Sequence, residues 1–408
     1  MDLFNVLTVK DTSNLIDENF DYKLEGEWVT LTQATGRILK NDIIAKENVP
    51  DFKRSTVDGY AVYSRDVFGA SESLSSMLDL KGEVLMGQKA EGEINIPGQC
   101  YYVPTGGMLP KGADSVIMIE YTDKLDDTTI LASKASSPGE NVVEIGEDIR
   151  EGEVVLKKAT KLRAYEIGVL SSLGFYEVEV FKKPTIGIIS TGDEVVHPTE
   201  SIKPGQIRDI NTYLLYSLIE DKGCIPVSYG LIKDEYDLLK NTAEKALSEC
   251  DIVLISGGSS VGKKDNTVKV IEDLEDGKLL VHGISVKPGK PTLIGKSNGK
   301  IIFGLPGHPL ACAVIFQVMV KYYIDKITEH KDVVYPIDCR FKINYHKAKG
   351  REEYLPVTIE ENGEDLTAVP VFGKSGLITS FSKAYGYIRI HRNEEGIKEG
   401  QKVKVYKF

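Results

Sequence analysis

The sequence predicts a multidomain α/β protein with a doubly wound α/β domain at its centre. The chain has 408 residues, of which 41% are hydrophobic, so it is long enough for roughly two to four domains. From Pro184 onward, short apolar segments alternate with segments of helical spacing. On either side of that region, glycines punctuate short β-branched runs, a pattern typical of smaller β domains.

These changes in the spacing of apolar residues and glycines along the chain predict four parts. Residues 1–50 and 140–182 form a helical and extended linking domain, and residues 51–139 form a small β domain. Residues 183–330 form the α/β domain. Residues 331–408 form a strand-rich C-terminal domain, for which we expect a β barrel, with a sandwich as the alternative.

The first part of the chain shows little chemistry. We expect helical pieces around Trp28–Leu39, followed by an Asp58-Gly59 turn that opens into an alternating apolar stretch. Taken alone, that turn indicates only a hairpin. Thr105 stands in a glycine turn between two predicted strands, where its hydroxyl is either structural or able to hold an oxyanion.

The α/β domain is predicted from strands and helices that alternate along the chain. This spacing indicates βαβ units with right-handed crossovers and a parallel sheet. A final apolar helix, Leu310–Ile327, should pack against the sheet. The other predicted elements are strands Thr185–Ser190, Ile225–Tyr229 and Ile252–Ser256, and helices Asn211–Lys222, Tyr236–Cys250 and Thr267–Leu274.

Three loops rich in glycine or proline follow apolar segments of this domain, and we expect them along one edge of its sheet, where open α/β sheets bind ligands. They are 257–263, 287–291 and 304–309. Backbone N–H groups, hydroxyls and lysines in the first loop suit a phosphate or another oxyanion. The expected ligand-binding residues are Gly257, Gly258, Ser259, Ser260, Gly262, Pro306, Gly307, His308 and Pro309.

The first loop also fits the pattern G-x-x-x-x-G-K of nucleotide-hydrolysing P-loop enzymes. Its next residue is Lys264, where a P-loop carries the hydroxyl that holds Mg²⁺. A P-loop-like enzyme therefore stays as an alternative. If Asp265→Ala removed activity while Lys264→Ala kept it, the result would argue against a P-loop enzyme.

Carboxylates follow the strands of the α/β domain, and we expect Glu194, Asp234 and Asp265 to meet at the carboxyl edge of the sheet. Convergent carboxylates beside phosphate-binding loops suit Mg²⁺. The alternative for Asp234 and Asp265 is that they cap the helices that follow them. In the second loop, prolines restrict Lys287 and Lys290, and ammonium groups held in this way suit a tetrahedral oxyanion.

Composition excludes several classes of function. A net charge of −11 argues against a general nucleic-acid surface. No apolar run approaches the roughly 18 residues of a membrane helix, and no signal peptide is apparent, so we expect a cytoplasmic protein. The five cysteines are widely spaced, without a zinc-binding pattern, and we expect buried reduced thiols.

Taken together, the loops resemble the molybdopterin molybdenumtransferase family, which includes MoeA and the gephyrin E domain. Any one match is weak, but eight in order cover nearly the whole chain and are specific. The matching segments are Ser55–Ala61, Pro104–Asp114, Gly146–Ile149, Ser190–Glu194, Gly205–Asn211, Ser256–Asp265, Lys287–Pro291 and Leu305–Pro309.

The resemblance implies an elongated homodimer whose active cleft lies between the α/β domain of one subunit and the small β domain of the other. It implies the last step of molybdenum cofactor synthesis, in which molybdate displaces AMP from adenylylated molybdopterin with Mg²⁺, and a handover of substrate from the adenylyltransferase of the pathway. The implied metal ligands are Glu194, Asp234 and Asp265. The implied catalytic residues are Asp58, Thr105, Asp148, Asp234, Asp265, Lys287 and Lys290.

Several residues depart from the common family pattern, and two questions stay open. Ser259, Lys263, Lys264, His308 and Tyr385 stand where the family usually has other residues. The sequence leaves open whether tungstate replaces molybdate. It also leaves open a scaffold that binds molybdopterin without turnover, for which AMP release is the discriminating measurement.

Overall fold

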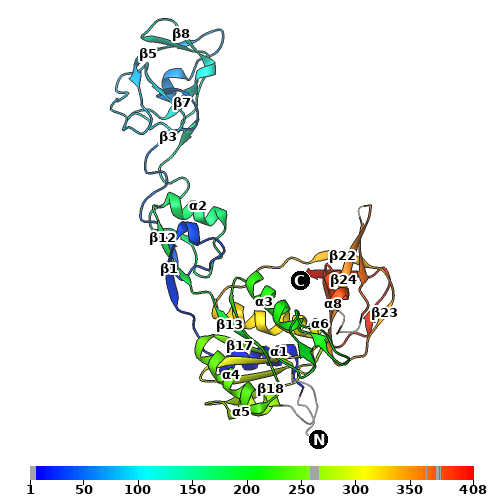
Figure 1. The fold of residues 1–408 in the computed structure, drawn as a ribbon. Coiled ribbons are helices and arrows are strands. Elements are labelled where there is room, and N and C mark those ends of the chain that lie inside the picture. Colours follow the sequence, from blue (N-terminus) through cyan, green and yellow to red (C-terminus); the bar gives the residue numbers. More distant parts are fainter. Residues whose placement is uncertain (1–5, 258–265, 364, 374–375, 377) are drawn as a thin grey trace. The chain divides into compact units, whose positions relative to one another are not determined.

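The structure is a computed structural model that describes residues 6–257, 266–363, 365–373, 376 and 378–408 (Figure 1). The chain divides into two compact units. Unit 1 comprises Met1–Glu27, Gly36–Ile38 and Glu179–Phe408, and unit 2 comprises Trp28–Thr35 and Leu39–Val178. Among the described residues, no helix combines the length and apolar character that crossing a membrane requires.

Unit 1 contains a six-stranded sheet with the strand order β16-β13-β17-β21-β20-β18. The first four strands are parallel, as the alternation of strands and helices predicts. β20 runs antiparallel to both of its neighbours, so the sheet is mixed. The strands are β16 (Ile225–Ile232), β13 (Thr185–Thr191), β17 (Ile252–Ser256), β21 (Lys300–Leu305), β20 (Leu293–Ser297) and β18 (Lys278–His282).

Helices cover both faces of this sheet, which confirms the doubly wound architecture. Successive residues of β17 enter opposite cores: Ile252 and Leu254 pack with α3 (Asn211–Asp221), whereas Val253 and Ile255 pack with α4 (Tyr236–Glu249) and α5 (Asn266–Asp273). A strand buried on both faces has apolar residues at consecutive positions. This packing explains why the β17 sequence shows no polar alternation.

The last predicted helix of the α/β domain is present but interrupted. It consists of α6 (Pro309–Ile315), a π-helical turn, η4 (Phe316–Val320), and α7 (Lys321–Ile327). Buried side chains from all three segments belong to the core that also receives α3. The single apolar helix predicted from the sequence is therefore correct in extent, apart from the π turn.

The prediction of helical pieces around Trp28–Leu39 is wrong in part. Gly26–Thr30 forms strand β1, because Val29 and Thr30 are β-branched and favour extended chain. The helix of this region comes earlier, as α1 (Val9–Asn19). Ile16 of α1 and Phe20 after it are buried in the core of unit 1, where the Phe20 ring lies 5.6 Å from that of Tyr323.

The C-terminal part of unit 1 is a closed five-stranded barrel, as predicted. The strands pair in the cycle β24-β25-β22-β28-β26, and β26 returns to β24. A short strand from the α/β region, β19 (Val286–Lys287), adds to β24 in parallel. The barrel strands are β22 (Ile337–Phe341), β24 (Glu352–Asn362), β25 (Asp365–Pro370), β26 (Gly386–Ile390) and β28 (Lys402–Lys407).

Unit 2 contains the small β domain, a six-stranded sheet with the order β7-β4-β6-β5-β9-β8. Its strands are β4 (Gly59–Val62), β5 (Ser76–Glu83), β6 (Gln99–Val103), β7 (Ser115–Met118), β8 (Thr122–Lys124) and β9 (Thr129–Ala132). Unit 2 also contains helix α2 (Ala164–Ser172). The remaining elements of both units are β2 (Ile43–Ile44), β3 (Arg54–Ser55), β10 (Val142–Val143), β11 (Val154–Leu156), β12 (Glu177–Phe181), β14 (Val195–Val196), β15 (Ile207–Arg208), β23 (Tyr345–His346), α8 (Ile378–Ser382), β27 (Gly396–Ile397), and the short 3₁₀ turns η1 (Leu31–Gln33), η2 (Ser64–Val67) and η3 (Ile119–Tyr121).

Candidate active site

The carboxyl edge of the unit 1 sheet opens into a pocket of about 580 Å³, which we call the acidic pocket. Ser256 at the end of β17 is in register with Leu305 at the end of β21, so the loops after these strands are neighbours. Leu293, at the start of β20, pairs with Gly304, which places the 287–291 loop at the same edge. The expected convergence of the three loops is confirmed for their described residues. The pocket is lined by Ser190, Thr191, Gly192, Glu194, Val195, Ile207, Arg208, Asp209, Ile210, Asn211, Asp234, Ser256, Gly257, Pro291, Pro306, Gly307, His308, Pro309 and Gly376.

Gly257, which follows β17 at this edge, has a backbone that passes close to the end of β13. Its φ of +105° lies in a region that side chains rarely adopt, and a Cβ there would lie 2.1 Å from the carbonyl oxygen of Thr191. Only glycine fits this position. The glycine predicted from the loop pattern is therefore required by the approach of two neighbouring strands.

Two of the three predicted metal-binding carboxylates, Glu194 and Asp234, line the acidic pocket. The N-cap of α4 is Glu235, so Asp234 does not cap the helix that follows it. Instead, the Asp234 carbonyl and carboxylate oxygens accept hydrogen bonds from Asn266 Nδ2 at 2.9 and 3.3 Å. Asn266 directly follows Asp265 in the sequence.

The donor set of the acidic pocket suits a magnesium ion in part. Among the described residues, no three histidine, cysteine or acidic side chains group together as a metal site. Mg²⁺ typically takes one or two protein carboxylates and completes its shell with water and substrate phosphates. Glu194 and Asp234 in one pocket match that requirement.

Buried polar residues after β15 also line this pocket, and no role was predicted for them from the sequence. Asn211 Nδ2 donates hydrogen bonds to Ser256 Oγ at 2.7 Å and to the Gly307 carbonyl at 2.9 Å, and so joins the loops after β17 and β21. Asp209 accepts a hydrogen bond from the Thr212 backbone N–H at 3.1 Å, at the start of α3. The signal that could have identified them is a polar residue just before the predicted helix 211–222, Asp209, and another at its first position, Asn211.

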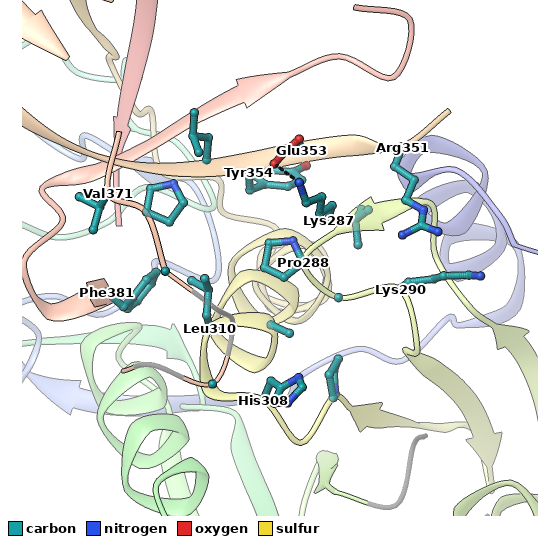
Figure 2. Close-up of a pocket in the computed structure, with 18 of the residues that line it drawn as sticks. Lys287, Pro288, Lys290, His308, Leu310, Arg351, Glu353, Tyr354, Val371 and Phe381 are labelled. Carbon is teal, nitrogen blue, oxygen red and sulfur yellow. Dashed lines mark ion pairs between the residues drawn. The ribbon is translucent and has the colours of Figure 1, made fainter. Parts of the chain in front are cut away.

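A second pocket, of about 830 Å³, lies between the α/β region and the C-terminal barrel of unit 1 (Figure 2). We call it the basic pocket because Lys287, Lys290 and Arg351 line it. Both lysines were predicted to hold an oxyanion, whereas Arg351 was missed. Leu310, Val371 and Phe381 form part of an apolar wall in the same pocket.

A buried carboxylate faces the basic pocket. Glu353 Oε1 lies 2.8 Å from Lys287 Nζ and accepts a hydrogen bond of 2.6 Å from the Tyr345 hydroxyl. Lys287 of β19 and Glu353 of β24 are partners in the parallel strand register, which brings the two side chains together. Burial and the hydrogen bond to Glu353 raise the pKa of Tyr345, so its hydroxyl stays a donor.

The acidic and basic pockets are adjacent. Pro291, Pro306, His308 and Gly376 line both of them. A ligand that extends past His308 can therefore contact the carboxylates of one pocket and the cations of the other.

In unit 2 the structure brings two of the three predicted residues together. Asp58 Oδ1 accepts hydrogen bonds from the Thr105 backbone N–H at 2.7 Å and from the Thr105 hydroxyl at 3.0 Å, and both residues are exposed. Asp148 is also exposed, but within the described chain it has no side-chain hydrogen bond to either residue. The Asp58-Gly59 segment leads directly into β4.

Comparisons with known proteins cover the whole chain. Residues 7–174 match the MoeA N-terminal region, residues 187–326 match a probable molybdopterin binding domain, and residues 338–408 match the MoeA C-terminal region. A molybdopterin molybdenumtransferase of Haemophilus influenzae is 32% identical over 99% of both chains. The chain belongs to the molybdopterin molybdenumtransferase (MoeA) family.

Further relatives support this membership. A putative molybdopterin biosynthesis protein of Methanocaldococcus jannaschii is 35% identical over 98% of both chains. The crystal structure of a molybdopterin biosynthesis MoeA protein from Pyrococcus horikoshii has a TM-score of 0.84 and 36% identity, with 99% of each chain covered. The MoeA fold therefore extends over the chain as a whole.

Other features that the sequence assigned to this MoeA family member are only partly described. Gly258, Ser259, Ser260, Gly262 and Asp265 lie outside the described residues, together with Lys263 and Lys264.

All five cysteines are buried and free, as predicted. Burial raises the pKa of the Cys312 thiol to about 12, so it is protonated at neutral pH and is a poor nucleophile.

Proposed function

We propose that the chain inserts molybdate into adenylylated molybdopterin and releases AMP. One observation carries the proposal: a pocket lined by three carboxylates, Glu194, Asp209 and Asp234, adjoins a pocket lined by three cations at the carboxyl edge of one sheet. This arrangement suits a reaction between two anions, one of which carries phosphates. Family membership supports the same reaction.

In this proposal the two pockets have different tasks. Lys287, Lys290 and Arg351 bind and orient the tetrahedral oxyanion, because cationic side chains offset its charge. Glu194 and Asp234 would hold Mg²⁺ in the acidic pocket. The third proposed ligand, Asp265, lies outside the described residues. When bound in the acidic pocket, the ion supplies positive charge to the phosphates of the substrate. Positioning and charge neutralisation then carry the rate, without a nucleophilic side chain.

The proposal keeps further parts that come from the family resemblance. They are a homodimer in which Asp58, Thr105 and Asp148 of the partner subunit complete the site, a cytoplasmic location, and delivery of the substrate by the adenylyltransferase of the pathway. Oligomeric state in solution, measured by light scattering at several concentrations, tests the dimer. A monomer with full activity would contradict it.

AMP release from adenylylated molybdopterin tests the reaction itself. The purified chain is assayed with Mg²⁺, with and without molybdate, and again with tungstate. We expect AMP release that depends on the oxyanion and is lost in Asp265→Ala. Binding of the pterin without AMP release under every condition would favour a non-catalytic scaffold.

Arg351→Ala is expected to raise the KM for molybdate at least about tenfold, because it removes a cation from the basic pocket. Initial rates of AMP release over a range of molybdate concentrations measure this change. Lys349→Ala is the matched control, since Lys349 forms an exposed ion pair with Glu395 at 2.9 Å and does not line the pocket. Equal KM values for both variants would exclude Arg351 from the oxyanion site.

A further inference from the structure

Glu353 is an unusual residue for a pocket that binds anions. It is 4% exposed, and among the described residues lining the basic pocket it is the one carboxylate. The other charged side chains there are Lys287, Lys290 and Arg351. Counting His308 as neutral, these groups carry a formal charge of +2, which equals the charge needed to neutralise a dianion.

We propose that Glu353 sets the charge selectivity of the oxyanion site by acting as a resident counter-anion for Lys287. The inference rests on the proposed function and deepens it. An incoming oxyanion competes with Glu353 for the Lys287 ammonium group. The carboxylate therefore lowers the affinity for every anion, and it lowers that affinity more the higher the negative charge of the anion.

The geometry supports this role. Two hydrogen-bonded partners, Lys287 at 2.8 Å and Tyr345 at 2.6 Å, hold the Glu353 carboxylate in place, and burial limits its screening by solvent. The Lys287 side chain is 56% exposed and is directed toward Glu353 (Figure 2). Because the Lys287 side chain is largely exposed, its ammonium group has room to turn from Glu353 to a ligand in the pocket.

Coulomb's law gives this role a signature that a purely structural role lacks. Repulsion between Glu353 and a bound anion scales with the charge of the anion. Removing the carboxylate charge therefore changes the logarithm of the affinity about twice as much for a dianion as for a monoanion. Molybdate and perrhenate provide this comparison, because both are tetrahedral and they carry two and one negative charges.

The experiment measures dissociation constants of molybdate and perrhenate by calorimetry on the full chain. Glu353→Gln keeps the size and acceptor oxygen of the side chain but removes its charge. We expect molybdate to bind at least about fivefold more tightly to this variant. The affinity for perrhenate should increase by about the square root of that factor. Tyr345→Phe, which removes the other hydrogen-bond partner of the carboxylate, should not increase the affinity for either anion.

The outcomes separate the inference from the proposed function. Weaker or unchanged molybdate binding in Glu353→Gln, or equal factors for the two anions, would overturn the role of Glu353. Failure of the unaltered chain to bind either anion would instead contradict the oxyanion site. AMP release is not needed for either conclusion.

A second pair of variants tests the same idea if Glu353→Gln does not fold. Because Glu353 partly neutralises Lys287, Lys287→Gln should raise the dissociation constant for molybdate less than Arg351→Gln does. Within the described chain, the Arg351 side chain has no ion-pair partner, so its full charge is available to the ligand. A larger effect at Lys287 would overturn the inference.

Discussion

Asp234→Asn is expected to lower kcat for AMP release at least about a hundredfold, because it removes a proposed ligand of Mg²⁺ from the acidic pocket. Asparagine keeps the shape of the side chain and an oxygen that can accept the hydrogen bond from Asn266. Steady-state rates at increasing Mg²⁺ measure the effect, and we expect the Mg²⁺ concentration at half-maximal rate to rise.

A neighbouring carboxylate provides the control for this prediction. Asp193 Oδ1 accepts a hydrogen bond from the Asp234 backbone N–H at 3.3 Å, but Asp193 does not line the acidic pocket. Asp193→Asn makes the same chemical change beside the site and should retain activity within about twofold. If Asp234→Asn were as active as Asp193→Asn, the metal assignment of Asp234 would be wrong.

Gly257→Ala is expected to destabilise unit 1 by about 3 kcal/mol or more. The added methyl group would meet the Thr191 carbonyl oxygen at 2.1 Å, and the φ of +105° is strained for alanine. Both effects destabilise the contact between the ends of β13 and β17, which are neighbouring strands in the interior of the sheet. Urea unfolding followed by far-ultraviolet circular dichroism measures the change in the unfolding midpoint.

Gly307→Ala is the matched control in the adjacent loop. A Cβ at Gly307 would have its nearest neighbour at 3.9 Å, and the backbone does not have a positive φ. We therefore expect a change of less than about 1 kcal/mol. Similar losses in both variants would show that the close approach to Thr191 does not limit residue 257.

Much of the fold of unit 1 could be predicted because local pattern and tertiary environment agree there. The consecutive apolar residues of β17 and the helical spacing before and after them identify a buried strand between helices. The antiparallel β20 was not predicted, since strand direction depends on the connection rather than on composition. Trp28 was predicted to be helical but lies in strand β1, because the extended preference of the β-branched residues after it outweighs the helical spacing.

The candidate site was predictable where its residues follow strands of one sheet or lie in the proline-bounded 287–291 loop. Glu194 and Asp234 belong to the first class, since residues after parallel strands meet at one edge. Arg351 and Glu353 belong to the barrel and reach the basic pocket through the pairing of β19 with β24. That contact joins two segments distant in the sequence, and neither segment alone carries a sign of it.

The burial of α1 in the core of unit 1 has a consequence for synthesis of the protein on the ribosome. Unit 2 is inserted between α1 and the sheet that covers it, so its residues are translated before that sheet exists. Ile16 and Phe20 can reach Tyr323 only after α7 has emerged. We therefore expect unit 2 to fold first on the nascent chain, while the apolar face of α1 stays accessible to chaperones.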